Sequence, residues 1–263
     1  MSVEEPYHAL PPRSETSVAA PAAYRAIQIL EALSAERGPL TVSEIALRVP
    51  LAKSSTSNLL GTLEATGMVR RTGVGWVLGY KALEIGQAVL ASTDLVSEFR
   101  RITAGLPTLA HETTLLAVLE GADVLYLARH DGNQRVRLAS DVGRRLPAVV
   151  TSLGKAMLAA LPEVELDEVL DGIPEMPRPT RRSHRTKADL RRDLAGVRAR
   201  GFAIDDEQNT IGVTCFGVPV PDSRPTAAVS CTFVTQRLTN GFGEAIVVEL
   251  QQLADRLAVF ARP

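Results

Sequence analysis

The chain has 263 residues, of which 45% are hydrophobic and 22% charged, and its formal net charge is −1. These values are typical of a soluble globular protein with one large domain or two ordinary ones. No run of eighteen apolar residues occurs, which argues against a membrane span. Residues 1–21 begin with acids and prolines and contain no apolar core of a signal peptide, so we expect a disordered tail on a cytoplasmic protein.

The first predicted helix covers residues 24–36, where apolar side chains recur at the spacing of an amphipathic helix, and Gly38 ends it. Thr41 and Glu44 then form a capping box, in which each side chain bonds the backbone amide of the other residue. The second helix is expected to be short, because Pro50 disfavours helical geometry at the residue before it.

A third helix is predicted to begin near Ser54 and to end at Gly67, which suits a left-handed helix stop. Leucines gather on one face of this helix, and small polar groups gather on the other. Such a polar face can enter a major groove and offer hydrogen bonds to base edges, although it is equally typical of the solvated surface of a small bundle. The candidate DNA contacts on this helix are Lys53, Ser54, Ser55, Thr56, Ser57 and Asn58.

Two short strand-like runs, residues 68–71 and 76–78, flank a tight glycine turn and predict a hairpin. Arg70 and Arg71 lie on this hairpin, where they are suited to contact phosphates. Three helices followed by a basic hairpin are typical of a winged helix-turn-helix. We therefore expect residues 22–79 to bind double-stranded DNA, with a protein-interaction module as the alternative.

Residues 80–104 carry long apolar stripes and predict a linker helix, with an interruption near Ser92–Asp94. Residues 105–263 read as an α+β domain with a mostly antiparallel sheet, because strands are grouped at both ends of a helical middle. Its expected strands are 115–119, 124–129, 135–139, 202–205, 214–220 and 227–233, and its expected helices are 151–161, 187–200 and 244–261.

Patterns typical of catalysis or of metal binding are weak. Gly154–Lys155 fails as a phosphate loop, because Val149 and Ala156 stand where that motif needs glycine and a hydroxyl residue. The acidic run 205–207 favours a solvated turn over a metal site, and the scattered histidines form no spaced ligand pair. No cofactor is predicted. An enzyme with an appended winged domain stays the alternative, which turnover of a bound small molecule would favour.

The two cysteines, Cys215 and Cys231, lie in apolar stretches. Two buried free thiols are favoured over a structural disulfide in a reducing cytosol.

Several segments, taken in order, resemble the IclR family of transcriptional regulators. They are residues 40–46, 52–56 and 59–67 in the DNA-binding part, 76–79 and 83–86 at the linker start, and 146–159, 200–207 and 212–220 in the effector part. The resemblance implies a GAF-like C-terminal fold with a ligand pocket on one face of its sheet. Asn58 departs from the family, which often has a larger base-reading residue there, so base readout is expected to differ.

The resemblance also implies which residues surround the effector. They are Leu138, Leu146, Ser152, Leu153, Asp205, Val213, Cys215, Ser230 and Thr232. The alternative for Leu138, Leu146 and Val213 is an ordinary place in the core. Ser152 is the best candidate, because it begins a helix whose unpaired amides and dipole favour an anion.

The sequence thus predicts a regulator, with a repressor favoured, whose operator binding responds to a small organic acid. A hydroxy acid or a hydrated keto acid is the first choice, because ionised Asp205 would repel a carboxylate but accept a hydrogen bond from a hydroxyl. A homodimer or a dimer of dimers on a roughly palindromic operator is expected, since one short recognition helix contacts too few base pairs to select a site.

Overall fold

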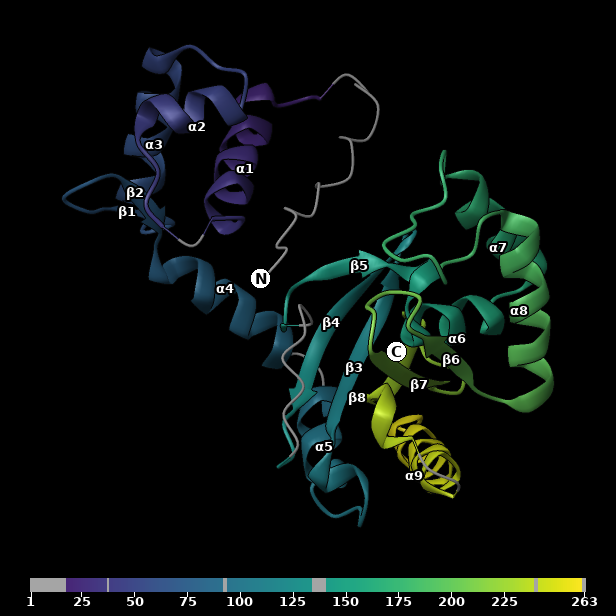
Figure 1. The fold of residues 1–263 in the computed structure, drawn as a ribbon. Coiled ribbons are helices and arrows are strands. Elements are labelled where there is room, and N and C mark those ends of the chain that lie inside the picture. Colours follow the sequence, from purple (N-terminus) through teal and green to yellow (C-terminus); the bar gives the residue numbers. More distant parts are fainter. Residues whose placement is uncertain (1–17, 37, 92–93, 134–140, 239–240, 262–263) are drawn as a thin grey trace. The chain divides into compact units, whose positions relative to one another are not determined.

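The computed structural model describes residues 18–36, 38–91, 94–133, 141–238 and 241–261. The chain divides into two compact units, Met1–Val89 and Leu90–Pro263, and each is described by itself (Figure 1). None of the helices in the described ranges is both long enough and apolar enough to span a membrane.

The first unit is a winged helix-turn-helix. Its core gathers Ile29 from the first helix, Ile45 from the second and Leu60 from the third, all fully buried. Leu40 pairs with Trp76 through two backbone hydrogen bonds of 2.9 and 2.7 Å, which form an isolated antiparallel bridge beside the hairpin. The elements are α1 (Pro21–Ser34), α2 (Val42–Arg48), α3 (Lys53–Ala65), β1 (Val69–Arg71), β2 (Trp76–Leu78) and α4 (Tyr80–Ala91).

The predicted start of α2 and the predicted stop of α3 are confirmed, whereas α1 (Pro21–Ser34) begins three residues before the predicted range 24–36 and ends two residues before its end. Thr41 Oγ1 accepts a hydrogen bond from Glu44 N at 3.3 Å, and Glu44 Oε2 accepts one from Thr41 N at 2.8 Å. Gly67 has φ of +75°, a left-handed conformation that side chains with a Cβ rarely adopt. These local signals fix where α2 begins and where the chain leaves α3 for the wing.

In the stretch 80–104 the structure describes two helices, α4 and α5 (Asp94–Thr103), and the predicted interruption at Ser92 and Thr93 lies outside the described residues. The structure differs from the predicted single linker helix because α5 is not part of a linker. This helix buries Val96, Phe99 and Ile102 in the core of the second unit, so it belongs to that unit. Only α4 keeps the exposure expected of a linker.

The second unit is built on a six-stranded sheet in which every neighbouring pair is antiparallel, as predicted. Its strand order is β5-β4-β3-β8-β7-β6. The predicted strand 135–139 lies outside the described residues, whereas β5 was not predicted. The strands are β3 (Thr113–Glu120), β4 (Asp123–His130), β5 (Arg145–Pro147), β6 (Ala203–Asp206), β7 (Val213–Pro219) and β8 (Ala227–Val234).

Helices cover both faces of this sheet (Figure 1). One face packs against α5 and α9 (Phe242–Leu257), and the other packs against α6 (Ser152–Ala160), α7 (Glu163–Asp171) and α8 (Lys187–Arg200). Three 3-10 turns, Leu109–His111, Ala148–Val150 and Thr235–Arg237, complete the described elements.

Because successive side chains along a strand point to opposite faces of the sheet, the strands contribute residues to two separate hydrophobic cores. On β8, Val229, Cys231 and Phe233 enter the core under α9, whereas Ala228 enters the core under α6. A strand buried on both faces reads as a nearly continuous apolar run, which is how this segment looks in the sequence.

Candidate functional site

The solvent side of α3 is small and polar. Lys53, Ser54, Ser55, Ser57 and Asn58 are all exposed there. No bulky side chain stands among them, so this face can approach the edges of base pairs closely.

Thr56 is a correction to the predicted set. Its side chain is fully buried beside Leu60, and its Oγ1 donates to the carbonyl of Ala52 at 3.1 Å. A residue three or four positions from the core leucines lies on the same helix face, so Thr56 stabilises α3 from within the core. It is not placed to contact DNA.

Arg70 and Arg71 lie on β1 and are exposed, as predicted for the wing. The Arg70 guanidinium stands 5.6 Å from the centre of the Tyr80 ring, and that of Arg71 stands 5.9 Å from the centre of the Trp76 ring. Aromatic faces orient both cations without neutralising them. Within the described ranges neither arginine has an acidic partner, so both charges are available to phosphates.

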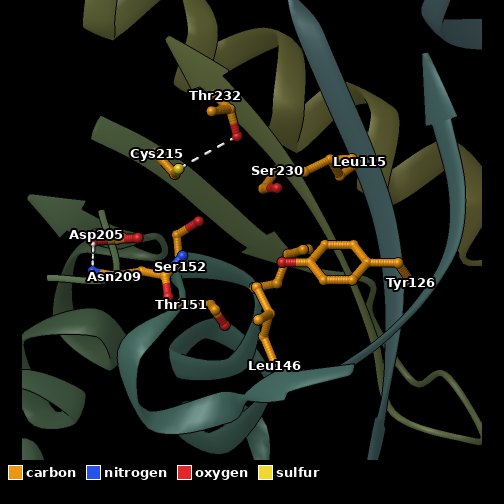
Figure 2. A pocket seen from close by; sticks show the side chains of 11 residues that line it. Leu115, Tyr126, Leu146, Thr151, Ser152, Asp205, Asn209, Cys215, Ser230 and Thr232 are labelled. Carbon is orange, nitrogen blue, oxygen red and sulfur yellow. Dashed lines mark hydrogen bonds between the residues drawn. The ribbon is translucent and has the colours of Figure 1, made fainter. Parts of the chain in front are cut away.

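A small cavity lies between α6 and the sheet of the second unit (Figure 2). Hydroxyl, carboxyl, carboxamide and thiol groups face leucine side chains across it. Figure 2 shows the ring of Tyr126 reaching from β4 with its hydroxyl toward the middle of the group. The lining residues are Leu115, Tyr126, Leu146, Thr151, Ser152, Leu153, Asp205, Asn209, Cys215, Ser230 and Thr232.

Close packing brings the start of α6 against the sheet. A Cβ on Gly217 of β7 would lie 2.5 Å from the carbonyl oxygen of Ser152, a distance that no side chain tolerates. Glycine at this position lets the first turn of α6 touch β7. The cavity is consequently bounded by a helix N-terminus and by the strand residues that alternate toward it.

The first turn of α6 presents amide donors. Thr151 caps the helix, since its Oγ1 accepts a hydrogen bond from Gly154 N at 3.0 Å. Within the described residues the amides of Ser152 and Leu153 have no hydrogen-bond acceptor. Unpaired amides and the helix dipole together favour an anionic group at this end of the cavity.

Asp205 supplies the carboxyl group of the cavity lining. Its Oδ1 accepts hydrogen bonds from Gln208 N at 2.7 Å and from Asn209 N at 3.1 Å. Burial raises the pKa of Asp205 to about 6, although those two hydrogen bonds and the charge of Lys155 act in the opposite direction. Near neutral pH this carboxyl group is therefore close to its own titration range.

The cysteines are free thiols, as predicted. Cys215 lines the cavity with its Sγ 3.3 Å from Thr232 Oγ1, whereas Cys231 lies in the core on the other side of the sheet. Burial raises the pKa of the Cys215 thiol, and the neighbouring charge of Asp205 adds to that shift. Cys215 is thus a neutral polar group of the cavity and a poor nucleophile.

The side chains of the acidic run 205–207 do not form one cluster. Asp205 is buried in the cavity wall, while Asp206 is exposed and pairs with Arg182 at 2.6 Å. No cluster of three metal-ligating side chains occurs in the part of the chain that the structure describes.

The cavity brings together most of the residues that the family resemblance implied. Leu138 lies outside the described residues. Val213 is a correction. It lies two positions before Cys215, so both side chains are expected on the same face of β7. Val213 is, however, the first residue of the strand and does not line the cavity. The predicted effector set lacked Leu115, Tyr126, Thr151 and Asn209. The predicted residues that do line it are Leu146, Ser152, Leu153, Asp205, Cys215, Ser230 and Thr232.

Comparison with known proteins agrees with both halves of this arrangement. Residues 22–73 match the IclR helix-turn-helix domain, and residues 87–259 match the bacterial transcriptional regulator IclR C-terminal domain. The chain is 32% identical over 232 residues to the HTH-type transcriptional regulator XynR of Escherichia coli, covering 87% of this chain and 92% of the relative. It is 30% identical over 224 residues to the E. coli transcriptional repressor IclR, covering 82% and 81%.

Solved structures show the same fold. The IclR of Thermotoga maritima aligns with a TM-score of 0.70 and 28% identity over 90% of this chain and 99% of that one. An IclR homologue from Microbacterium hydrocarbonoxydans, complexed with 4-hydroxybenzoate, aligns with a TM-score of 0.75 and 25% identity over 90% and 99%. With both domain models matched in order, the chain belongs to the IclR family of DNA-binding bacterial transcriptional regulators.

Proposed function

We propose that this chain is a sequence-specific repressor whose operator binding is modulated by a small organic acid held in the cavity beside α6. The observation that carries this proposal is the cavity itself, which combines unpaired helix amides at Ser152 and Leu153 with an apolar wall. A carboxylate and a short carbon skeleton are the ligand that such a site accommodates.

The chemistry of the lining narrows the acid further. Ser230 and Thr232 add hydroxyl donors, and Leu115 and Leu146 supply apolar contact. Asp205 accepts a hydrogen bond from a ligand hydroxyl, so a hydroxy acid or a hydrated keto acid is the proposed class. The neighbour complexed with 4-hydroxybenzoate holds an acid of this kind, which supports the choice.

We assign DNA recognition to residues 22–79. Within this domain, Lys53, Ser54, Ser55, Ser57 and Asn58 of α3 are proposed to face the major groove, and Arg70 and Arg71 of the wing are proposed to contact phosphates. Repression is proposed because relatives of this length include the transcriptional repressor IclR and the acetate operon repressor. A regulator of this kind acts beside the chromosome, so we propose the cytoplasm as its compartment.

We propose that the protein acts as a homodimer, or as a dimer of dimers, on a roughly palindromic operator. The support is the exposed apolar surface of α4, where Tyr80, Leu83 and Ile85 are 73%, 60% and 51% exposed. Ile27 of α1 is 55% exposed. Apolar side chains in such number on one helix are usually covered by a partner.

The test is calorimetric titration with lactate, 2-oxobutyrate and 4-hydroxybenzoate, followed by DNA binding with and without the acid that binds. We expect one acid to bind stoichiometrically, to stay chemically unchanged and to alter DNA affinity. Ser152→Leu should weaken that binding, because the leucine fills the anion end of the cavity. Equal binding by this variant would show that the pocket is misplaced, and conversion of the acid would favour the enzyme alternative.

A further inference from the structure

A fully buried lysine stands behind the cavity wall. Lys155 belongs to α6, one turn after Ser152, and its side chain has 0% exposure. Its ammonium donates to Asp193 Oδ2 of α8 at 2.7 Å, to the carbonyl of Ile204 in β6, and to the side-chain oxygen of Gln208. One charge therefore joins α6, α8, β6 and the segment after β6.

On the α8 side the charge is balanced. Asp193 also contacts His184 Nε2 at 3.1 Å and Arg200 Nη2 at 3.4 Å. Burial alone would raise the pKa of Asp193, but the hydrogen bond with His184 and the charge of Lys155 hold it well below its usual range. Asp193 is accordingly ionised and is the counter-ion of the buried ammonium.

On the other side lies the segment 205–209, whose ends line the cavity. Asp205 Oδ1 binds the amides of Gln208 and Asn209. The hydroxyl of Thr180 donates to the Glu207 carbonyl at 2.7 Å, and Ser183 donates to the Gln208 carbonyl at 2.7 Å. The Lys155 ammonium is the contact that ties this segment to the helix on which the anion would rest.

Stability alone does not explain such a residue. Desolvating an ammonium and a carboxylate costs free energy that an apolar pair of similar volume avoids, and such replacements are often neutral or stabilising. Through its contact with Gln208, the Lys155 ammonium fixes where the segment 205–209 lies. Fixed distances between α6 and the segment 205–209 keep Asp205 and Asn209 opposite the first turn of α6.

We propose that Lys155 is a positioning residue of the effector pocket, which sets the place of Asp205 and Asn209 relative to the N-terminus of α6 by holding Gln208. The ligand-binding consequence rests on the proposed function, whereas the ordering of the segment does not. In this role Lys155 does not need to touch the effector itself.

Two variants test this role. Gln208→Met removes the contact of the segment with the Lys155 ammonium, together with the contact of Gln208 Nε2 with His184 Nε2 at 3.3 Å, at a half-buried position. The double variant Lys155→Met, Asp193→Asn removes both charges together, so that neither is left unpaired. Arg182→Gln is the matched control, because it breaks an exposed ion pair with Asp206 on the same segment and leaves the ammonium untouched.

The first readout is hydrogen exchange of the ligand-free protein. Both test variants should accelerate exchange at the amides of positions 208 and 209 at least tenfold, with β3 and β8 unchanged, while Arg182→Gln behaves as the wild type. The second readout is titration with lactate, 2-oxobutyrate and 4-hydroxybenzoate, where the acid that binds the wild type should bind both test variants at least tenfold more weakly.

Unchanged exchange in Gln208→Met overturns the proposal, whether or not the double variant folds. Unchanged acid affinity in a folded Gln208→Met overturns it as well. If no acid binds the wild type, the proposed function fails, and the exchange result still decides the role of Lys155.

Discussion

Asp205 is the residue on which the charge of the cavity depends. With the pKa of its buried carboxyl raised to about 6, it is neutral in mildly acidic solution and ionised above neutrality. A neutral carboxyl retains an oxygen that accepts a hydrogen bond from a ligand hydroxyl, whereas the ionised form also repels a ligand carboxylate. Lys155 and Asp206 are the charged neighbours that act on it, with opposite signs.

Affinity for an organic acid should therefore depend on pH. Because Asp205 loses its proton as pH rises through about 6, binding of the acid should weaken above that value, by up to tenfold per pH unit. Asp205→Asn, which stays neutral, should remove this dependence. Calorimetric titrations between pH 5 and 8 measure it, and a wild-type affinity that is flat over this range contradicts the assigned charge state.

The same shift has a consequence for stability. A carboxyl with a raised pKa in the folded state binds its proton more tightly than in the unfolded chain, so folding loses stability as pH rises from about 4 to 6. Asp205→Asn should lessen that loss in urea unfolding at pH 4.5 and 6.5. A variant that loses as much as the wild type shows that Asp205 is not the group responsible.

Among the elements, α3 carries both a buried residue, Thr56, and an exposed candidate for base contact, Asn58, and the two can be tested against each other. Thr56→Val should leave sequence preference unchanged, because the valine fits the buried position and touches no base. Asn58→Ala should instead alter preference at one or two base pairs, each worth about 1–3 kcal/mol. Selection of bound fragments from random DNA compares the two variants. A changed preference in Thr56→Val would place that residue on the groove side after all.

The wing offers a second element-scale test. Replacing Arg70 and Arg71 by alanine should weaken DNA binding across all sequences, since phosphate contacts carry no base information. The slope of log affinity against log salt should fall by about 1 for each lost contact. Fluorescence anisotropy over a series of salt concentrations measures both, and an unchanged slope in the folded double variant contradicts the wing assignment.

Elements with local signals were predictable from the sequence, and those that depend on tertiary context were not. The capping box at Thr41 and the glycine at Gly67 mark α2 and α3 by themselves. β5 is three residues long and exists only because β4 pairs with it. Tyr126 was not predicted because its place in the cavity depends on the pairing of β4 with β3 and β5, which the sequence of the strand alone does not show. In the sequence Lys155 appeared only as part of a failed phosphate-loop motif. Its role was not predictable because its partners Asp193 and Gln208 lie 38 and 53 positions away along the chain.

At the scale of the whole molecule, α4 is the element that most needs a partner. Leu83 and Ile85 are exposed apolar residues within a helix that is otherwise solvated. Replacing both by glutamate should leave the chain folded and shift it from dimer to monomer, with loss of cooperative binding to a palindromic operator. Light scattering at micromolar concentration with DNA present reports the state. A wild-type protein that is monomeric there contradicts the dimer.

In the proposed function, one acid in the cavity changes the affinity of the winged domain for DNA. A ligand regulates only when it binds the two arrangements of the protein with different affinity, and the change in DNA affinity equals that difference. The direct measurement titrates the wild-type complex with its selected operator against the acid that binds, and repeats it with Ser152→Leu. We expect a saturable change of at least fivefold in the operator affinity of the wild type, and no such change in the variant. Operator affinity that stays constant while the acid saturates the cavity would contradict the proposed function.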